Sequence, residues 1–540
     1  MQSQTPAGKP VPKSKLTDIS KLISSYYTND IQKPVLFGTS GHRGSSLDGT
    51  FNELHIESTV QAICDYRSAS KIKGPLYLGF DTHALSEPAF RTSLEVLAGN
   101  KINVLINRGD EYTPTPVISF MILEHNRKKN AASADGIIIT PSHNPPRDGG
   151  IKYNPPSGGP AGNKITTWIE DRANQIAGQK KSLIKKMPYE AAQRSSFITQ
   201  QDFITPFVES LSQVIDMEII QMSGIKIGID PMGGAGIHFW QPIADRYNLN
   251  MDIINTDVDQ QFGFMTADWD GKIRMDCSSS CAMTNLISLA DKFDIAWGND
   301  PDFDRHGIVT PQGLMNPNHY LAAAIWYLLQ NRPEWNKEVS IGKTLVSSSM
   351  IDEVTNGLNR KVYEVPVGFK WFVKGLYNGT IAFGGEESAG ATFLRKNGEV
   401  WTTDKDGFCM TLLAAEILAK TQKTPQEIYQ DILVPAYGNP YYKRIDSPVT
   451  NEEKQILSRL DLQSIKGANI AGIDISSATT KAAGNNASMG GIKIILKDGS
   501  WCAVRPSGTE PIMKFYMESF GGQELVKKIH ELAKNLLFNN

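Results

Sequence analysis

An acidic segment with the sequence NDPDFDRHG (residues 299–307) has residue types and spacing suited to metal chemistry. Asp300, Asp302 and Asp304 alternate along it, so their carboxylates can converge on one side of an extended loop. Three neighbouring carboxylates repel one another strongly unless a cation neutralises them. Since all three ligands would be hard oxygens, the expected ion is Mg²⁺, with Mn²⁺ as a substitute.

Two other interpretations of this segment are weaker. A Ca²⁺-binding EF-hand needs Gly at its sixth position and Glu at its twelfth, where this sequence has Arg305 and Pro311. A solvated acidic turn conflicts with Phe303 and with the apolar run FDIAWG (residues 293–298), which both indicate partial burial. Metal binding is therefore the preferred interpretation.

A second segment, ITPSHNPPRDGGIKYN (residues 139–154), contains a serine suited to phosphoryl chemistry. Ser142 follows an apolar run and lies in a turn rich in Pro and Asn, with His143 beside it and Lys152 on the next apolar run. A hydroxyl on a rigid turn with cationic neighbours can accept and donate a phosphoryl group. Taken alone, the segment is better explained as a turn whose polar side chains cap the backbone, since it lacks a G-x-S-x-G nucleophile elbow. A phosphate on Ser142, however, could complete the metal shell within reach of Arg305.

Two glycine-containing loops predict contacts with a sugar phosphate. In GGEESAG (residues 384–390), Glu386 and Ser388 alternate on one face and suit sugar hydroxyls, although a solvated Gly-rich turn is an equal alternative. In RPSGTEP (residues 505–511), an Arg fork, two hydroxyls and a glycine form a candidate phosphate nest. Further candidate cations are Arg43 in GTSGHRG (residues 38–44) and Lys370 in VPVGFKW (residues 365–371).

The elements that must position these loops recur three times. Short apolar runs alternate with helix-period segments, which is typical of βαβ units around mostly parallel strands. The first runs of the three units are LYLGFD (76–81), IKIGID (225–230) and KTLVSS (343–348). The last run of each unit leads directly into the Ser142, Asp300 or Glu386 loop. Because α/β sheets bind ligands at the carboxyl ends of their strands, we expect one cleft assembled from three domains.

The composition limits the class of protein. A chain of 540 residues predicts three to five domains. Lys and Arg total 55 against 57 for Asp and Glu, which argues against nucleic acid or a membrane as partner. The apolar run at residues 320–329 is too short to span a bilayer, and the polar start is no signal peptide. Five cysteines indicate reduced thiols, with Cys277 and Cys281 expected to be buried, in a cytoplasmic protein.

The predicted fold class is α/β. It consists of three similar α/β domains with mixed, mostly parallel sheets, and a smaller C-terminal α+β domain, around a central cleft. The expected boundaries are a flexible leader at 1–15 and domains at 16–205, 206–318, 319–434 and 435–540. In the last domain, residues 492–504 are predicted to form a strand–turn–strand unit, and residues 524–537 are predicted to form an amphipathic helix.

Four motifs in this order, TPSHNP, DPDFDRHG, GEESAG and RPSGTEP, resemble the signature loops of the α-D-phosphohexomutase superfamily. Within it the bacterial phosphoglucomutases are most similar, through GTSGHRG, DTHALSEPAF, IRMDCSS, GFKWFV and TDKDG. The resemblance covers nearly the whole chain. It implies interconversion of glucose 1-phosphate and glucose 6-phosphate through a phosphoserine enzyme, with glucose 1,6-bisphosphate as intermediate and activator.

The resemblance also implies roles for individual residues. Mg²⁺, one per chain, would be held by Ser142, as its phosphate, and by Asp300, Asp302 and Asp304. The catalytic group would comprise Ser142, His143, Lys152, Arg43, Arg305 and Lys370. The sugar hydroxyls would contact Glu386 and Ser388, and the non-reacting phosphate would contact Arg505, Ser507, Gly508 and Thr509. Some relatives of broader specificity have His where this chain has Gly390, so mannose phosphates are expected to be poorer substrates.

Three alternatives remain open from the sequence. The first is a mutase acting on mannose or N-acetylglucosamine phosphates. The second is a catalytically silent sugar-phosphate-binding protein, against which the intact Ser142, Asp triad and Arg505 count. The third is a phosphatase, which differs only in whether water reaches the phosphoserine. The expected partners are small hexose phosphates, and the expected assembly is a monomer or homodimer.

Overall fold

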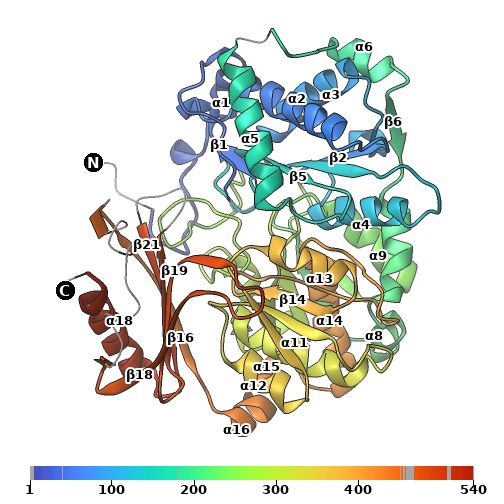
Figure 1. Ribbon diagram of the computed structural model, residues 1–540. Coiled ribbons are helices and arrows are strands. Elements are labelled where there is room, and N and C mark those ends of the chain that lie inside the picture. Colours follow the sequence, from blue (N-terminus) through green and yellow to red (C-terminus); the bar gives the residue numbers. More distant parts are fainter. Residues whose placement is uncertain are drawn as a thin grey trace.

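The computed structural model describes residues 5–38, 41–179, 182–450, 452–453, 457, 468–506 and 512–538. Its strands form four sheets that follow one another along the chain. Figure 1 shows the first domain at the top, the second and third below it, and the fourth, in red, to one side. This arrangement confirms the predicted fold class, with one difference in the fourth domain described below.

The first domain contains a six-stranded mixed sheet with the order β1-β5-β4-β2-β3-β6. β2, β3, β4 and β6 are parallel, while β5 runs antiparallel to β4 and to β1. The strands are β1(His42–Gly44), β2(Leu76–Phe80), β3(Val104–Asn107), β4(Asp135–Ile139), β5(Gly149–Asn154) and β6(Ile198–Gln201). The helices are α1(Ile19–Thr28), α2(Glu53–Ala69), α3(Ser86–Gly99), α4(Thr115–Asn126), α5(Asn163–Gly178) and α6(Tyr189–Arg194). In Figure 1, α2, α3 and α5 lie on one side of this sheet and α4 on the other.

The second and third domains repeat a smaller version of this plan. Their sheets have the orders β11-β10-β9-β7-β8 and β13-β12-β14-β15, and in each the site loop follows a central parallel strand. The strands of the second domain are β7(Ile227–Asp230), β8(Met251–Ile253), β9(Ile295–Gly298), β10(Gly307–Thr310) and β11(Gly313–Leu314). Those of the third are β12(Ser340–Thr344), β13(Lys361–Val365), β14(Ile381–Glu386) and β15(Gly390–Phe393). The helices from here to the fourth domain are α7(Ile204–Ser210), α8(Met217–Ser223), α9(Ile237–Tyr247), α10(Thr284–Ile287), α11(Pro317–Asn331), α12(Met350–Gly357), α13(Val373–Tyr377), α14(Gly407–Thr421), α15(Pro425–Ile428) and α16(Val434–Tyr437).

The fourth domain is built differently, from an antiparallel sheet with the order β16-β21-β20-β19-β18-β17. Its elements are β16(Tyr441–Pro448), β17(Asn469–Ile470), β18(Ile473–Lys481), β19(Ser488–Leu496), β20(Trp501–Pro506), β21(Ile512–Ser519) and α18(Gln523–Phe538). The predicted strand–turn–strand at 492–504 and the C-terminal helix are confirmed. The stretch that the sequence shows only as rich in Ser, Ala, Gly and Asn is largely strand, since β18 and β19 occupy most of it.

One continuous apolar cluster joins the first three domains. Aromatic rings from separate domains pack against one another within it in tilted and edge-on arrangements: Phe207 contacts Trp401 and Phe408 at centroid distances of 5.5 and 5.3 Å, and Trp240 contacts Phe408 at 5.0 Å. Such well-packed interiors resist small displacements. The three domains therefore hold their loops in a defined relative position.

A predicted strand of the third domain is shifted. The run KTLVSS was expected to form it, but β12 ends at Thr344. Leu345 and Val346 instead bury against Trp501 and Tyr516 of the fourth domain. Their hydrophobicity thus reflects a contact between domains, which an apolar run does not distinguish from a strand.

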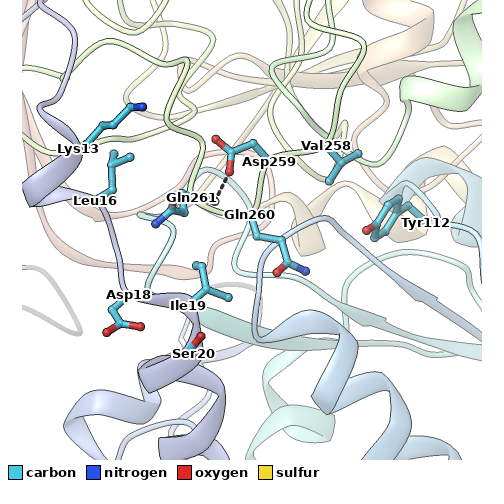
Figure 2. Close-up of a pocket in the computed structure, with 10 residues that line it drawn as sticks. All are labelled: Lys13, Leu16, Asp18, Ile19, Ser20, Tyr112, Val258, Asp259, Gln260 and Gln261. Atoms are coloured by element: carbon cyan, nitrogen blue, oxygen red, sulfur yellow. Dashed lines mark hydrogen bonds between the residues drawn. The ribbon is translucent and has the colours of Figure 1, made fainter.

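The described part of the leader lies against the second domain. The Gly8 amide donates to the Ala267 carbonyl at 2.7 Å, and the Ala267 amide donates to the Lys9 carbonyl at 2.9 Å. Val11 packs against the apolar cluster of that domain. Figure 2 shows Lys13 of the leader, together with residues 16 and 18–20 of the first domain, facing residues 258–261 across a pocket. A segment expected to be flexible therefore has defined backbone and apolar contacts.

The five cysteines are unpaired, and Cys281 is half-buried instead of buried as expected. Within the described residues, no helix combines the length and the apolar character needed to cross a membrane.

Candidate active site

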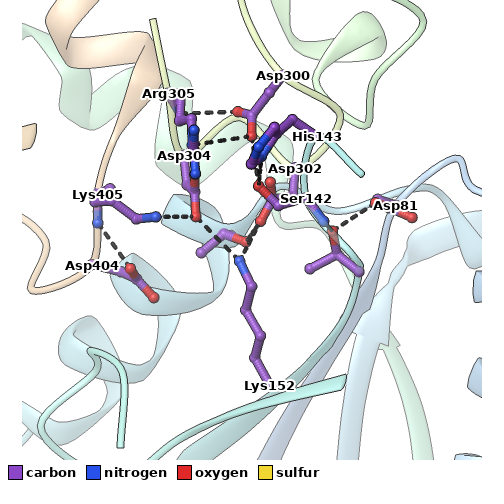
Figure 3. A network of polar contacts seen from close by, with 12 residues as sticks. Asp81, Ser142, His143, Lys152, Asp300, Asp302, Asp304, Arg305, Asp404 and Lys405 are labelled. Carbon is purple, nitrogen blue, oxygen red and sulfur yellow. Dashed lines mark hydrogen bonds and ion pairs between the residues drawn. The ribbon is translucent and has the colours of Figure 1, made fainter. Parts of the chain in front are cut away.

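Ser142 lies just beyond β4 and is completely buried. Its backbone has a left-handed φ of 60°, which is uncommon for a residue with a side chain. Ser142 Oγ donates a hydrogen bond to Asp300 Oδ2 at 2.8 Å. The serine of the first domain and the acidic loop of the second thus meet directly, as Figure 3 shows.

A buried carboxylate at the end of β2 holds the Ser142 turn in place. Asp81 accepts hydrogen bonds from Thr140 Oγ1 at 2.6 Å and from His83 Nδ1 at 2.9 Å. Thr140 Oγ1 in turn accepts from the Ser142 amide at 2.8 Å, and His83 Nε2 lies 3.0 Å from the Asn144 carbonyl. Both sides of the turn are therefore anchored to Asp81, which stabilises the unusual backbone at Ser142.

Replacing Thr140 with valine tests this anchor. Valine has the same shape but lacks the hydroxyl, so the buried Ser142 amide loses its acceptor and Asp81 loses a donor. We expect the free energy of unfolding to fall by about 1–3 kcal/mol and kcat to fall about tenfold as Ser142 shifts. Denaturant titration and steady-state kinetics measure both. Thr167→Val, on the exposed part of α5, is the matched control, and equal effects in the two variants would contradict this role of Thr140.

The acidic segment forms a tight turn, which corrects the expectation of an extended loop. The Phe303 amide donates to the Asp300 carbonyl at 2.8 Å, and Phe303 has a left-handed φ of 59°. Its ring is buried 4.8 Å from that of Phe408, centroid to centroid. Burial of this ring drives the chain to turn between the second and third carboxylates. The three carboxylates converge nonetheless, with ligand atoms within 4.8 Å of one another.

Two lysines from different domains meet these carboxylates. Lys152 on β5 of the first domain donates to Asp302 Oδ2 at 2.6 Å and to Asp304 Oδ2 at 3.1 Å. Lys405 of the third domain lies 2.7 Å from Asp304 Oδ2. Figure 3 shows both ammonium groups converging on Asp304. The cluster therefore exists only where three domains meet.

The charges are unevenly compensated within the cluster. Burial alone raises the pKa of Asp304, but Lys152, Lys405 and Arg305 outweigh it and hold this pKa far below its ordinary value. Burial lowers the pKa of Lys152, yet Asp302 and Asp304 hold it above its usual range. Asp300 differs, because burial and its two acidic neighbours raise its pKa well above the ordinary value. Of the three carboxylates, only Asp300, which contacts Ser142, has a pKa raised above its ordinary value.

Two carboxylate oxygens have the properties expected of metal ligands. Asp302 Oδ1 and Asp304 Oδ1 are buried and have no hydrogen-bond partner among the described residues. Such orphaned charged oxygens are costly unless a cation meets them. Together with the raised pKa of Asp300, they fit a hard divalent cation held by the triad.

Further predicted residues surround Ser142. His143 Nδ1 lies 3.4 Å from Ser142 Oγ, and burial, aided by the charge of Arg305, lowers the His143 pKa to about 3. Arg305 Nε lies 3.9 Å from Asp300 Oδ2 and 3.8 Å from Asp304 Oδ1. Arg43 on β1 donates to Asn144 Oδ1 at 3.3 Å. His143 and Arg305 therefore border the serine and its acidic partner, and Arg43 contacts Asn144 in the same turn as the serine.

The predicted sugar-binding residues belong to the third domain, and their loop contacts the metal loop: the His306 amide donates to the Ala389 carbonyl at 3.1 Å. Glu386, at the end of β14, is buried and accepts a hydrogen bond from the Gly368 amide at 2.9 Å. Ser388 is half-buried in the turn that follows. Lys370 is not brought to Ser142: its ammonium donates to Asn163 Oδ1 at 2.6 Å.

Lys370 interacts electrostatically with Glu386 of the sugar loop and with Arg505 of the fourth domain. Burial lowers its pKa; Glu386 opposes this shift, whereas Arg505 acts in the same direction. Arg505, at the end of β20, therefore acts electrostatically on the sugar side of the site. The other predicted phosphate-binding residues, Ser507, Gly508 and Thr509, lie outside the described residues.

Lys405 is the main site residue that the sequence analysis did not single out. The motif TDKDG could have indicated Lys405 as a site residue, because a lysine between two aspartates is unusual next to an apolar segment. The first domain holds this loop: the Asp404 amide donates to Ser119 Oγ at 3.3 Å, and Asn154 Nδ2 donates to Asp404 Oδ2 at 2.9 Å. Contacts between distant segments thus place Lys405.

Comparison with known proteins agrees with this geometry. Four sequence profiles match in order: the phosphoglucomutase/phosphomannomutase alpha/beta/alpha domains I (residues 34–180), II (205–313) and III (316–435), and the C-terminal domain (447–535). A phosphoglucomutase of Komagataeibacter xylinus is 54% identical over 98% of this chain and 96% of its own. The cytoplasmic phosphoglucomutase of Mesembryanthemum crystallinum is 25% identical over 94% and 95%.

Solved structures share the fold. Parafusin, a phosphoglucomutase from Paramecium, has a TM-score of 0.75 at 21% identity, covering 94% of this chain and 96% of its own. A putative phosphomannomutase from Thermus thermophilus has a TM-score of 0.72 at 23% identity, covering 93% and 99%.

Three α/β domains and an antiparallel C-terminal domain, with a buried serine against an aspartate triad, define a sugar-phosphate mutase. The profiles cover most of the chain, and the bacterial relative matches almost end to end. The chain belongs to the phosphoglucomutase/phosphomannomutase family of the α-D-phosphohexomutases, which are isomerases.

Proposed function

We propose that this protein is a phosphoglucomutase that interconverts glucose 1-phosphate and glucose 6-phosphate. The observation that carries the proposal is the direct contact of Ser142 Oγ with Asp300 Oδ2, in a chain 54% identical to a named phosphoglucomutase. A serine used only as a turn residue has no need to contact a buried carboxylate of another domain. That contact suits a serine that carries a phosphoryl group next to a metal ion.

In the proposed reaction, Ser142 carries the phosphoryl group. A sugar hydroxyl attacks the phosphorus, the bond from phosphorus to Ser142 Oγ breaks, and the hydroxyl proton is transferred so that Ser142 ends as an alcohol. The product is glucose 1,6-bisphosphate. After this molecule turns around, Ser142 attacks its other phosphate, and the second monophosphate leaves.

The residues around Ser142 supply charge at the transferring phosphoryl group. Lys152 is held protonated by Asp302 and Asp304, so it acts as a fixed cation and is a poor proton acceptor. Arg305 and Arg43 add guanidinium groups suited to phosphate oxygens. The triad is proposed to hold Mg²⁺, which would polarise the phosphorus and neutralise developing charge. His143, kept neutral by burial, is proposed to contact the phosphoserine.

The remaining residues are proposed to orient the sugar. Glu386 and Ser388 would contact its hydroxyls, with Lys370 nearby. The non-reacting phosphate would bind Arg505 together with Ser507, Gly508 and Thr509 of the fourth domain. Because each end of the bisphosphate must in turn reach Ser142, we propose that the fourth domain moves away from the cleft during the reorientation.

The test is a substrate panel with the purified protein. We expect glucose 1-phosphate to be isomerised, with glucose 1,6-bisphosphate accelerating the reaction. Mannose 1-phosphate and N-acetylglucosamine 1-phosphate are expected to react at least about tenfold more slowly, because hydroxyl contacts discriminate between such sugars. Coupled assays measure each product, and a separate assay measures free phosphate. A preference for another sugar, or faster release of phosphate than isomerisation, would overturn the proposal.

A further inference from the structure

Gly390 is the last residue of the sugar loop (residues 384–390). It lies against the side chain of Lys405, which contacts Asp304 of the metal cluster. It begins β15 and pairs with Glu386, which ends β14. Its φ is not in the left-handed region, so the backbone here does not require glycine. A Cβ at this position, however, would lie 2.3 Å from Lys405 Cδ and 3.1 Å from Lys405 Cγ. Glycine is therefore needed for space, because the stem of Lys405 passes directly over it.

The lysine stem has little freedom to move aside. At its tip, Nζ lies 2.7 Å from Asp304 Oδ2, and only 8% of the residue is exposed. At its base, the Lys405 amide donates to Asp404 Oδ1 at 2.9 Å, and Asp404 is itself bound to Asn154 of the first domain. With both ends held, a stem displaced by a new methyl group at Gly390 must withdraw its ammonium from Asp304.

We propose that Gly390 is a positioning residue for Lys405: its missing side chain keeps open the path by which the lysine of the third domain reaches Asp304. This inference rests on the proposed function. The charge of Lys405 also opposes the burial that raises the pKa of Glu386, so one side chain influences both the sugar carboxylate and the metal cluster. A larger residue at position 390 would thus disturb the phosphoryl-transfer site. This loss would outweigh any improved fit of the sugar pocket to another hexose.

A double-mutant cycle tests the proposal with Gly390→Ala, Lys405→Ala and the double variant. We expect Gly390→Ala to lower kcat for glucose 1-phosphate at least about tenfold, as Lys405→Ala does, because the transferring group loses a cation. In the Lys405→Ala background the space is already free, so adding Gly390→Ala should change kcat by less than about twofold. Additive losses in the double variant would overturn the proposal, as would an unchanged kcat in Gly390→Ala.

A second measurement does not depend on turnover. Paramagnetic resonance reports the affinity of the dephosphorylated protein for Mn²⁺. Removing an ammonium group from the triad removes a competing positive charge, so Gly390→Ala and Lys405→Ala should each bind Mn²⁺ about tenfold more tightly, without additivity. If the wild-type protein fails to isomerise glucose 1-phosphate but this cycle holds, the proposed function fails and the role of Gly390 stands. Unchanged or weaker Mn²⁺ binding in Gly390→Ala overturns that role.

Stability provides the remaining control. If Gly390→Ala unfolds, the double variant distinguishes the cause, because removing the Lys405 stem removes the predicted clash. A double variant with the same melting temperature as Lys405→Ala alone supports the proposal. A double variant that is less stable than Lys405→Ala shows that the cost of a side chain at Gly390 does not act through Lys405, which overturns it.

Discussion

Replacing Ser142 with alanine is expected to lower the turnover of glucose 1-phosphate by at least about 10⁴-fold, because the proposed covalent carrier of the phosphoryl group is lost. The fold should survive. Alanine occupies the same buried space, and the anchor of the turn, from the Ser142 amide to Thr140 and Asp81, involves no atom of the Ser142 side chain. The lost hydrogen bond to Asp300 is expected to change stability by about 1 kcal/mol.

Two measurements check this expectation. A coupled assay reports turnover, and intact mass before and after incubation with glucose 1,6-bisphosphate reports whether one phosphoryl group is gained. The wild-type protein should gain it and Ser142→Ala should not. Ser68→Ala, at an exposed position near the end of α2, is the matched control and should behave as wild type. A Ser142→Ala protein with normal turnover would exclude the phosphoserine mechanism.

Replacing Asp302 with asparagine is expected to lower kcat about 10³-fold. Its Oδ1 is buried without a hydrogen-bond partner, while its Oδ2 accepts from Lys152 and from Thr115 Oγ1 at 2.7 Å. An amide cannot satisfy both sides: its NH₂ group must face either the proposed metal ion or two donors. The loss of charge weakens the metal site, and an unfavourable contact of this kind costs several kcal/mol in a buried site.

The measurement combines kinetics with metal dependence. Chelation should abolish turnover of the wild-type protein, and Mg²⁺ should restore it better than other divalent ions. Asp302→Asn should need a much higher Mg²⁺ concentration for its residual activity. Asp291→Asn, at an exposed position of the same domain, should match the wild type. Activity that is insensitive to chelation, or an Asp302→Asn variant with an unchanged need for Mg²⁺, would contradict a metal role for the triad.

The position of the site at a junction explains the large effect of Asp302→Asn. Lys152, Asp302 and Lys405 come from three domains, and the ion pairs of Lys152 with Asp302 and of Lys405 with Asp304 join different domains. This substitution therefore leaves the buried charge of Lys152 without its full partner, which costs more than the loss of an exposed ion pair. The continuous apolar cluster beneath the site stabilises this arrangement of charges.

Much of the fold could be predicted from the sequence. The runs leading to Ser142, Asp300 and Glu386 are strands β4, β9 and β14, as expected, because buried parallel strands are short and almost wholly apolar. The shifted strand β12 shows the limit of this reasoning. Leu345 and Val346 are as apolar as a strand, but they are buried by the fourth domain. An apolar run shows that a segment is buried and not which neighbour buries it.

The sequence by itself determined which residues are candidates for chemistry, since alternating aspartates and a serine in a Pro-rich turn are local patterns carried by residue type and spacing. Only the tertiary structure decided which charges meet. It bent the Asp300–Asp304 turn around the buried ring of Phe303, and it brought Lys405 over Gly390 onto Asp304. The reason is physical: electrostatic energies depend on distance and burial, and both are set by the packing of separate domains.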